Sequence, residues 1–189
     1  MRMRNVMAAA LTGLALLGLA GTASAQTGLT WPPKDVTPVH KTKAELEKQA
    51  AGFTARVRQT FPKVFRGAQN VEPGNWGGEA EGVFDDMQYM TNWTEFTVNG
   101  QDNTVFMQVN APGFFSNSPA QVCEQNTCTG SESDHRGGVT VFTKNDLYGT
   151  ATAWNFRRNG EVVYVQSWTQ GTEAQLAAVA SDRAYTFTR

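Results

Sequence analysis

The chain has 189 residues, of which 16 are basic and 17 acidic, and it includes 5 Trp, 4 Tyr and 11 Phe. So many aromatic residues exclude a disordered tail, and the composition also excludes a coiled coil and a multi-span membrane protein. No long basic stripe is present, so we expect no nucleic-acid partner.

Residues 1–25 have the pattern of a secretory signal peptide. Arg2 and Arg4 precede an apolar run over residues 8–20, and Ala23-Ser24-Ala25 forms an A-x-A cleavage site. The apolar run is too short to favour a membrane-spanning helix, and a retained N-terminal anchor is the alternative. We therefore expect a secreted protein, extracellular or periplasmic, with no membrane span after signal removal. Cleavage leaves 14 basic against 17 acidic residues, a formal net charge of −3.

The spacing of the two cysteines is consistent with export to an oxidising compartment. Cys123 and Cys128 are five positions apart, and thiols this close form disulfides in an oxidising compartment. The C-x4-C spacing differs from the C-x-x-C of thioredoxin-type redox proteins. The spacing therefore favours a structural disulfide over redox or metal chemistry.

Residues 26–41 form an extended lead-in with three prolines, and we expect Trp31 to dock it onto the domain. A helix follows, because Thr42 and Glu45 form a capping box. Its apolar stripe recurs at helical spacing and should end near Thr60, before Phe61-Pro62. The members of the stripe are Leu46, Ala50, Phe53 and Val57.

Two glycine-rich or polar stretches, 67–82 and 111–138, are expected to be irregular. Between them, residues 91–98 and 104–110 alternate like strands. A tight Asn99-Gly100 turn would pair Val98 with Gln101, whereas a five-residue loop would place Phe96 opposite Phe106. The aromatic pair favours the longer loop.

A third strand, 139–143, precedes the clearest hairpin, which joins 150–157 to 162–169 through a two-residue Asn159-Gly160 turn. This register places Trp154 and Phe156 on one face with Val163 and Val165, and both faces carry apolar groups. A second capping box, Thr172 with Gln175, starts a short C-terminal helix. The segment 185–188 either adds a last strand or docks.

The predicted fold class is α+β, with a mostly antiparallel sheet of about five strands, an N-terminal helix and a short C-terminal helix. The predicted organisation is a signal peptide over 1–25, an extended lead-in over 26–41 and a single α+β domain over 42–189. Trp154, Phe156 and Trp168 lie on strands and are expected to be core residues.

Three aromatic residues lie in flexible segments and are the candidate binding residues. Trp76, in G-N-W-G-G, either presents its ring to a sugar or a partner's pocket, or folds inward as a lid on the sheet. Phe114 and Phe115, between Pro112-Gly113 and Ser116-Asn117, pose the same alternatives.

Catalytic signatures such as G-x-S-x-G, a Walker loop and H-E-x-x-H are missing from the sequence. We assign no catalytic residue, metal site or cofactor, and we interpret His40 and His135 as exposed loop residues. The neighbouring Ser131, Ser133, Asp134 and His135 lie in one polar loop that cannot orient a triad. An acidic cluster near Trp76 could serve glycoside hydrolysis, but a solvated rim is the simpler reading. Its members are Glu79, Glu81, Asp85 and Asp86.

The second half of the chain resembles a group of uncharacterised secreted proteins and lipoproteins from actinobacteria. The similarity lies in the order V-F-M-Q-V-N-A-P-G-F, C-E-Q-N-T-C, G-G-V-T-V-F, the hairpin N-F-R-R-N-G-E-V-V-Y-V-Q-S-W and E-A-Q-L-A-A-V-A-S-D, from Val105 to Asp182. The resemblance implies an envelope location and no reaction. This chain has no lipobox cysteine, so we expect release rather than lipid anchoring.

These observations predict a small exported, non-catalytic binding or interaction domain that acts at or outside the cell envelope. Its partner would be an envelope polymer or a secreted protein. Two alternatives stay open: a secreted hydrolase of envelope sugar that uses the acidic cluster, and a protease inhibitor that inserts the loop from Cys123 to Cys128.

Overall fold

The computed structural model describes residues 29–78, 82–134, 136–169 and 171–189, so the expected signal segment lies outside the described residues. The helices are α1 (Lys43–Val64), α2 (Pro119–Gln125) and α3 (Glu173–Ala180). The strands are β1 (Ala68–Pro73), β2 (Tyr89–Val98), β3 (Gln101–Asn110), β4 (Thr127–Ser133), β5 (Val139–Asn145), β6 (Thr150–Phe156) and β7 (Val162–Ser167).

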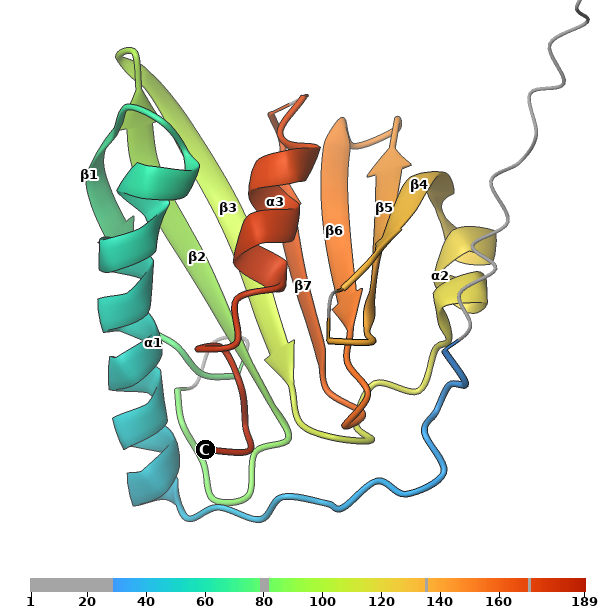
Figure 1. Cartoon of the computed structure of the whole chain (residues 1–189). Helices are drawn as coiled ribbons and strands as arrows, with labels where there is room; N and C mark the ends of the chain where they lie inside the picture. The colour runs from blue at the N-terminus through green and yellow to red at the C-terminus, as the bar shows by residue number, and fades with distance from the viewer. Residues whose placement is uncertain (1–28, 79–81, 135, 170) are drawn as a thin grey trace, which may run out of the picture.

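The strands form one antiparallel sheet in the order β1-β2-β3-β7-β6-β5-β4 (Figure 1). The α+β class and the two terminal helices are confirmed. The expected number of about five strands is wrong, because β1 and β4 lie inside the stretches that we expected to be irregular. Helix α2 was also missed, although Ser118 and Gln121 form a capping box at its start.

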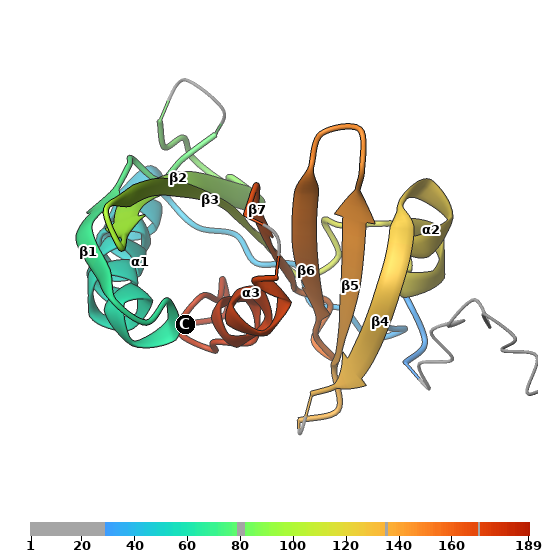
Figure 2. The same cartoon turned by 90° about the horizontal axis from the view of Figure 1, so that it is seen from above.

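The sheet separates two apolar cores. Seen from above, β1, β2, β3 and β7 curve around α1 and α3, while α2 lies beside β4 and β5 on the opposite side (Figure 2). We call the side of α1 and α3 the inner face and the other side the outer face. The larger core lies on the inner face and includes Leu46, Phe53, Val57, Val105, Met107, Val163, Val165 and Leu176. The outer core lies under α2 and contains Val122, Val139, Val141, Phe156 and Val162.

Helix α1 begins as predicted and ends later than predicted. Thr42 and Glu45 form the capping box. The helix continues through Pro62 to Val64, because Phe61 is fully buried and its ring packs against Phe65 and Phe96. The burial of this ring outweighs the hydrogen bond that the proline removes.

The turn between β2 and β3 has the register that we did not favour. Val98 pairs with Gln101, and Asn99 and Gly100 have φ angles of 52° and 76°, as a two-residue type I′ turn requires. Phe106 therefore lies opposite Trp93, and their rings are 4.8 Å apart between centroids. The aromatic pair that guided the prediction exists, but it contains Trp93 in place of Phe96.

The β6–β7 connection is longer than predicted. The Gly160 amide donates to the Arg157 carbonyl and the Arg157 amide to the Glu161 carbonyl, which closes a three-residue loop with Gly160 at φ 85°. Asn159 has no positive φ, so the predicted two-residue turn is wrong. This extra loop residue shifts the pairing by one position and moves every side chain of one strand to the other face.

Because of this register shift, the side chains of the hairpin lie on different faces from those predicted. Phe156 pairs with Val162 and Trp154 with Tyr164, all on the outer face, whereas Val163 and Val165 lie in the inner core. Trp154 is only partly buried. Trp168 follows the end of β7 and is 44% exposed, so its expected place in the core is wrong.

The C-terminal segment docks without forming a strand. Tyr185 and Phe187 are buried in the inner core. Helix α3 starts at the predicted place, but Thr172 makes no side-chain cap and donates to the Thr169 carbonyl instead. None of the helices in the described part of the chain combines the length and apolar character that a membrane crossing requires.

Candidate functional site: an aromatic row on the outer face

Aromatic rings contact one another in a line across four neighbouring strands of the outer face. Trp93 on β2 contacts Phe106 on β3, which contacts Tyr164 on β7, which stacks on Trp154 on β6. Successive centroids are 4.8, 5.7 and 4.4 Å apart. Trp168 extends the line at one end by stacking on Trp93 at 5.4 Å and 23°. Phe115 extends it at the other end, 5.6 Å from Trp154. These six residues are the aromatic row.

The row passes from a buried end to an exposed end. At Phe115 it joins the outer core, where Trp31 docks the lead-in as predicted, by donating from Nε1 to the Phe115 carbonyl. At the other end Trp93 is 50% exposed and Trp168 is 44% exposed. Large half-exposed rings in one continuous patch are typical of binding surfaces.

At the exposed end, the described outer-face side chains of β2, β3 and β7 that flank the rings are all polar. Directly opposed strand residues share a face, so the pairings identify these neighbours. The amide of Gln108 accepts a hydrogen bond from the Tyr164 hydroxyl at 2.9 Å, and Gln108 donates to Asn110 at 2.7 Å. No aliphatic residue occupies the outer-face positions of β2 from 93 to 97, of β3 from 102 to 108 or of β7 from 164 to 168. The non-aromatic residues there are Glu95, Thr97, Asp102, Thr104, Gln108 and Gln166.

A recess of about 430 Å³ lies at the exposed end. Its walls include the rings of Trp93 and Trp168 together with Asp102 and Asn103. The Asn103 Oδ1 accepts a hydrogen bond from the Thr169 hydroxyl at 2.9 Å, which holds the amide in place. The recess therefore combines two apolar ring faces with a carboxylate and an amide.

Burial changes the acid–base behaviour of a tyrosine in the row. Burial, with a smaller contribution from Tyr89, raises the pKa of Tyr164 to about 12. The phenol therefore stays protonated to a higher pH than a free tyrosine, and it donates its hydrogen bond to Gln108 over that wider range.

The three predicted binding residues have different positions. Trp76 folds inward, is 4% exposed, and packs against Phe53 and Tyr185, so it is the lid of the inner core. Phe114 is 46% exposed and stacks on Tyr89 at 5.3 Å. Phe115 belongs to the aromatic row. Sequence reasoning missed Trp93, Phe106 and Trp168 as surface residues. For Trp93 the sequence held a signal, because strand alternation places it on the same face as charged Glu95.

Of the predicted acidic cluster, the structure describes only Asp85 and Asp86, and each has a hydrogen-bonding partner. Glu79 and Glu81 lie outside the described residues. Asp85 accepts from the Lys43 amide at 2.5 Å at the start of α1, and Asp86 accepts from His40 Nδ1 at 2.9 Å. These partners give both described carboxylates a structural role. Among the residues that the structure describes, no three His, Cys, Asp or Glu side chains gather as a metal site requires.

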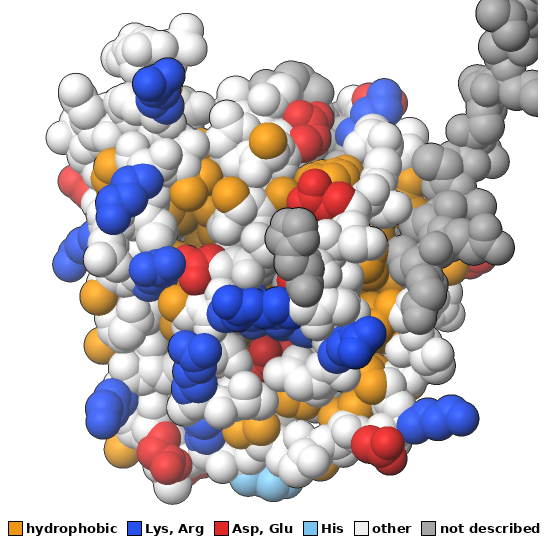
Figure 3. Space-filling model, in the orientation of Figure 1, with side chains coloured by type: hydrophobic (Ala, Val, Ile, Leu, Met, Phe, Trp, Pro, Cys, Tyr) orange, Lys and Arg blue, Asp and Glu red, His pale blue; other side chains and the backbone are white. Residues whose placement is uncertain are grey.

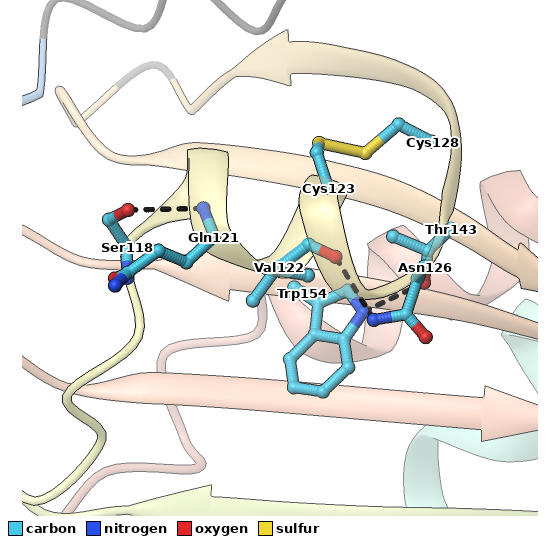
Figure 4. Close-up of a disulfide and its surroundings, with 8 residues drawn as sticks. All are labelled: Ser118, Gln121, Val122, Cys123, Asn126, Cys128, Thr143 and Trp154. Atoms are coloured by element: carbon cyan, nitrogen blue, oxygen red, sulfur yellow. Dashed lines mark hydrogen bonds between the residues drawn. A yellow bond between two sulfur atoms is a disulfide. The ribbon is translucent and has the colours of Figure 1, made fainter.

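The disulfide between Cys123 and Cys128 is present and joins the end of α2 to β4 (Figure 4). Both half-cystines pack against the outer core beside fully buried Val122. The Asn126 amide donates to the Val122 carbonyl at 3.0 Å. The half-cystines thus hold the loop on the sheet, while Glu124, Gln125 and Thr127 between them are exposed. Ser131 and Ser133 lie on β4, while His135 lies outside the described residues.

Comparisons with protein-family models, with curated proteins and with solved structures find no match for this chain.

Proposed function

We propose that this chain is an exported, non-catalytic domain that binds a glycan polymer of the cell envelope through the aromatic row. The observation that carries the proposal is the composition of the outer face at its exposed end, where half-exposed aromatic rings are bordered by hydroxyl, amide and carboxylate groups alone. The signal pattern of residues 1–25 and the resemblance to secreted actinobacterial proteins support the envelope location.

This composition favours a sugar over an apolar protein partner. The C–H face of a sugar ring is apolar and packs on an indole, while its rim of hydroxyls needs donors and acceptors at the side. Trp93 and Trp168 supply such faces, and Asp102 and Asn103 lie beside them in the recess. A partner that docked by burying aliphatic side chains would be matched by aliphatic groups on this surface, and the described outer-face positions of β2, β3 and β7 at the exposed end carry none.

Retention by glycans tests the proposal. The chain from Gln26 is mixed with insoluble cell-wall material and, in separate assays, run through gels that contain soluble neutral polysaccharides. We expect retention by at least one glycan, and a loss of about tenfold or more in affinity for Trp93→Ala and Trp168→Ala. Tyr148→Ala is the matched control, since Tyr148 is 68% exposed and lies outside the row.

Two results would contradict the proposal: no retention of the wild-type chain by any glycan, or equal retention of the row variants and of Tyr148→Ala. Capture of a secreted protein by the row in place of a glycan would also contradict it. Export is tested separately by N-terminal sequencing of protein recovered from the medium or periplasm, where we expect Gln26 as the first residue. An intact Met1 on the exported protein would exclude signal cleavage.

A further inference from the structure

A second hollow surface lies on the opposite side of the sheet, at the C-terminal end of α3. A groove of about 760 Å³ runs between α1 and the β4–β5 connection, and a smaller recess of about 250 Å³ adjoins it. Arg136 and Arg183 line both hollows, so the two share a wall. In the space-filling view, basic side chains gather around this part of the face (Figure 3). We call the two hollows together the arginine groove.

The groove is positive although the chain is not. Six basic residues line it against four acidic ones, in a chain with a formal net charge of −1. Three of the four acids already have an arginine partner, in the ion pairs Arg183–Asp134, Arg56–Asp182 and Arg157–Glu161. Glu132 is the fourth. The basic residues are Arg56, Lys63, Arg136, Arg158, Arg183 and Arg189.

Two of the guanidinium groups have partners within the protein that orient them. Arg158 Nε donates to the Gly137 carbonyl at 3.0 Å, and its side chain lies flat over that residue. A Cβ at Gly137 would lie 2.2 Å from Arg158 Nε, so only glycine permits this placement. Asp134 holds Arg183 through an ion pair and also accepts from the Arg136 amide at 2.8 Å. Cations that are ordered before binding lose less entropy when a ligand arrives.

The surroundings supply neutral hydrogen-bonding groups next to the cations. Asn159, Thr186 and Thr188 line the smaller recess. Planar guanidinium groups match the oxygens of phosphate in paired hydrogen bonds, which a lysine ammonium cannot reproduce. The recess thus offers Arg136, Arg158 and Arg183 around a space that suits a compact oxyanion.

We propose that the arginine groove binds a phosphate group, either on a free phosphorylated molecule or on a lipid headgroup. The site does not depend on the aromatic row, because the two lie on opposite faces of the sheet. Both can therefore be occupied at once, and each is tested without the other.

Calorimetric titration with inorganic pyrophosphate and sedimentation with vesicles distinguish the two sources. The vesicles contain phosphatidylglycerol in phosphatidylcholine, with pure phosphatidylcholine as the comparison. We expect wild type to bind at least one of the two phosphate probes, and the double variant Arg136→Ala/Arg158→Ala to bind it about tenfold more weakly. Pyrophosphate binding without vesicle binding assigns a free ligand, and vesicle binding assigns a headgroup.

The matched control is Arg58→Ala/Arg66→Ala, which removes the same charge from exposed residues outside the groove. We expect its affinity to stay within about twofold of wild type, and Arg158→Lys, which keeps the charge, to lose affinity. Equal losses of affinity in the two double variants would show that net charge alone accounts for phosphate binding, and would overturn the proposal. Failure of the wild type to bind pyrophosphate or phosphatidylglycerol vesicles would also overturn it.

Discussion

Arg157 and Glu161 form an ion pair inside the protein, with 3.1 Å between Nη1 and Oε2 and with at most 1% of either residue exposed. The remaining donors of Arg157 reach Asn155 Oδ1 and the carbonyls of Ala180, Asp182 and Tyr185. Glu161 accepts from the Thr186 hydroxyl and the Phe187 amide. The pair therefore fastens the β6–β7 connection to α3 and to the C-terminal segment.

Removing one partner of this pair should destabilise the protein strongly. We expect Glu161→Gln and Arg157→Met each to lower the free energy of unfolding by about 3–5 kcal/mol, because each leaves a buried group uncompensated. Urea denaturation measures the loss. Arg158→Met, at the exposed neighbouring position, is the control and should change stability by less than about 0.5 kcal/mol. A loss below about 1 kcal/mol in Glu161→Gln would show that the pair is not structural.

Truncation to alanine should destabilise the protein much more at Trp76 than at Trp168. Trp76→Ala should cost about 3–5 kcal/mol, since the ring is buried against Phe53 and Tyr185. Trp168→Ala should cost about 1 kcal/mol or less, because 44% of this residue is exposed. Chemical denaturation of both variants gives the comparison. Similar losses would contradict the assignment of Trp76 to the core and of Trp168 to the surface.

The disulfide should stabilise the segment from α2 to β4. Replacing both Cys123 and Cys128 with serine should lower stability by roughly 2 kcal/mol, the loop-entropy value for a six-residue loop. Hydrogen exchange should increase in α2 and β4 and remain unchanged in β2 and β3. No thiol should titrate in the native protein. A reactive, reduced thiol would instead indicate a redox role.

Alkaline pH should destabilise the protein through its buried phenols. Burial raises the pKa of Tyr164 to about 12 and also raises that of Tyr185. An unfolded tyrosine ionises at about pH 10, so this contribution to stability is complete below about pH 10 and is lost as the pH rises through about 12. The free energy of unfolding should decline less steeply over this range in Tyr164→Phe than in wild type. Tyr148→Phe, at an exposed position, should decline like wild type, and identical slopes in all three proteins would contradict the assignment.

The two Asn-Gly turns show which features of the hairpins could be predicted from the sequence. Both dipeptides predict a connection between antiparallel strands, and both connections exist. The dipeptide does not determine loop length, because Gly100 completes a two-residue turn and Gly160 closes a three-residue loop. At the second turn, the burial of Arg157 and Glu161 favours the register that pairs them. That preference depends on α3 and the C-terminal segment, which local pattern cannot reveal.

The aromatic row could not be predicted from the sequence, because its contacts also depend on strand pairings between distant parts of the chain. Its strand residues are contributed by β2, β3, β6 and β7, and the central contact between Phe106 and Tyr164 joins strands 58 positions apart. The predicted strands contained these rings, but the shifted registers assigned them different neighbours. Edge strands β1 and β4 were missed because their largely exposed sequences bury few side chains and so lack a clear apolar alternation.

The pairing of β3 with the last strand, β7, has a consequence for how the chain folds. Residues 105–110 must find residues 162–167 before the middle of the sheet exists, and contacts so distant in sequence slow the search for the native state. Until then, α1 and the β1–β3 meander lack the Val163, Val165 and Leu176 side chains that complete their apolar core. We therefore expect the rate of folding to be governed by this closure, and a nascent chain that stops before β7 to expose the apolar face of α1.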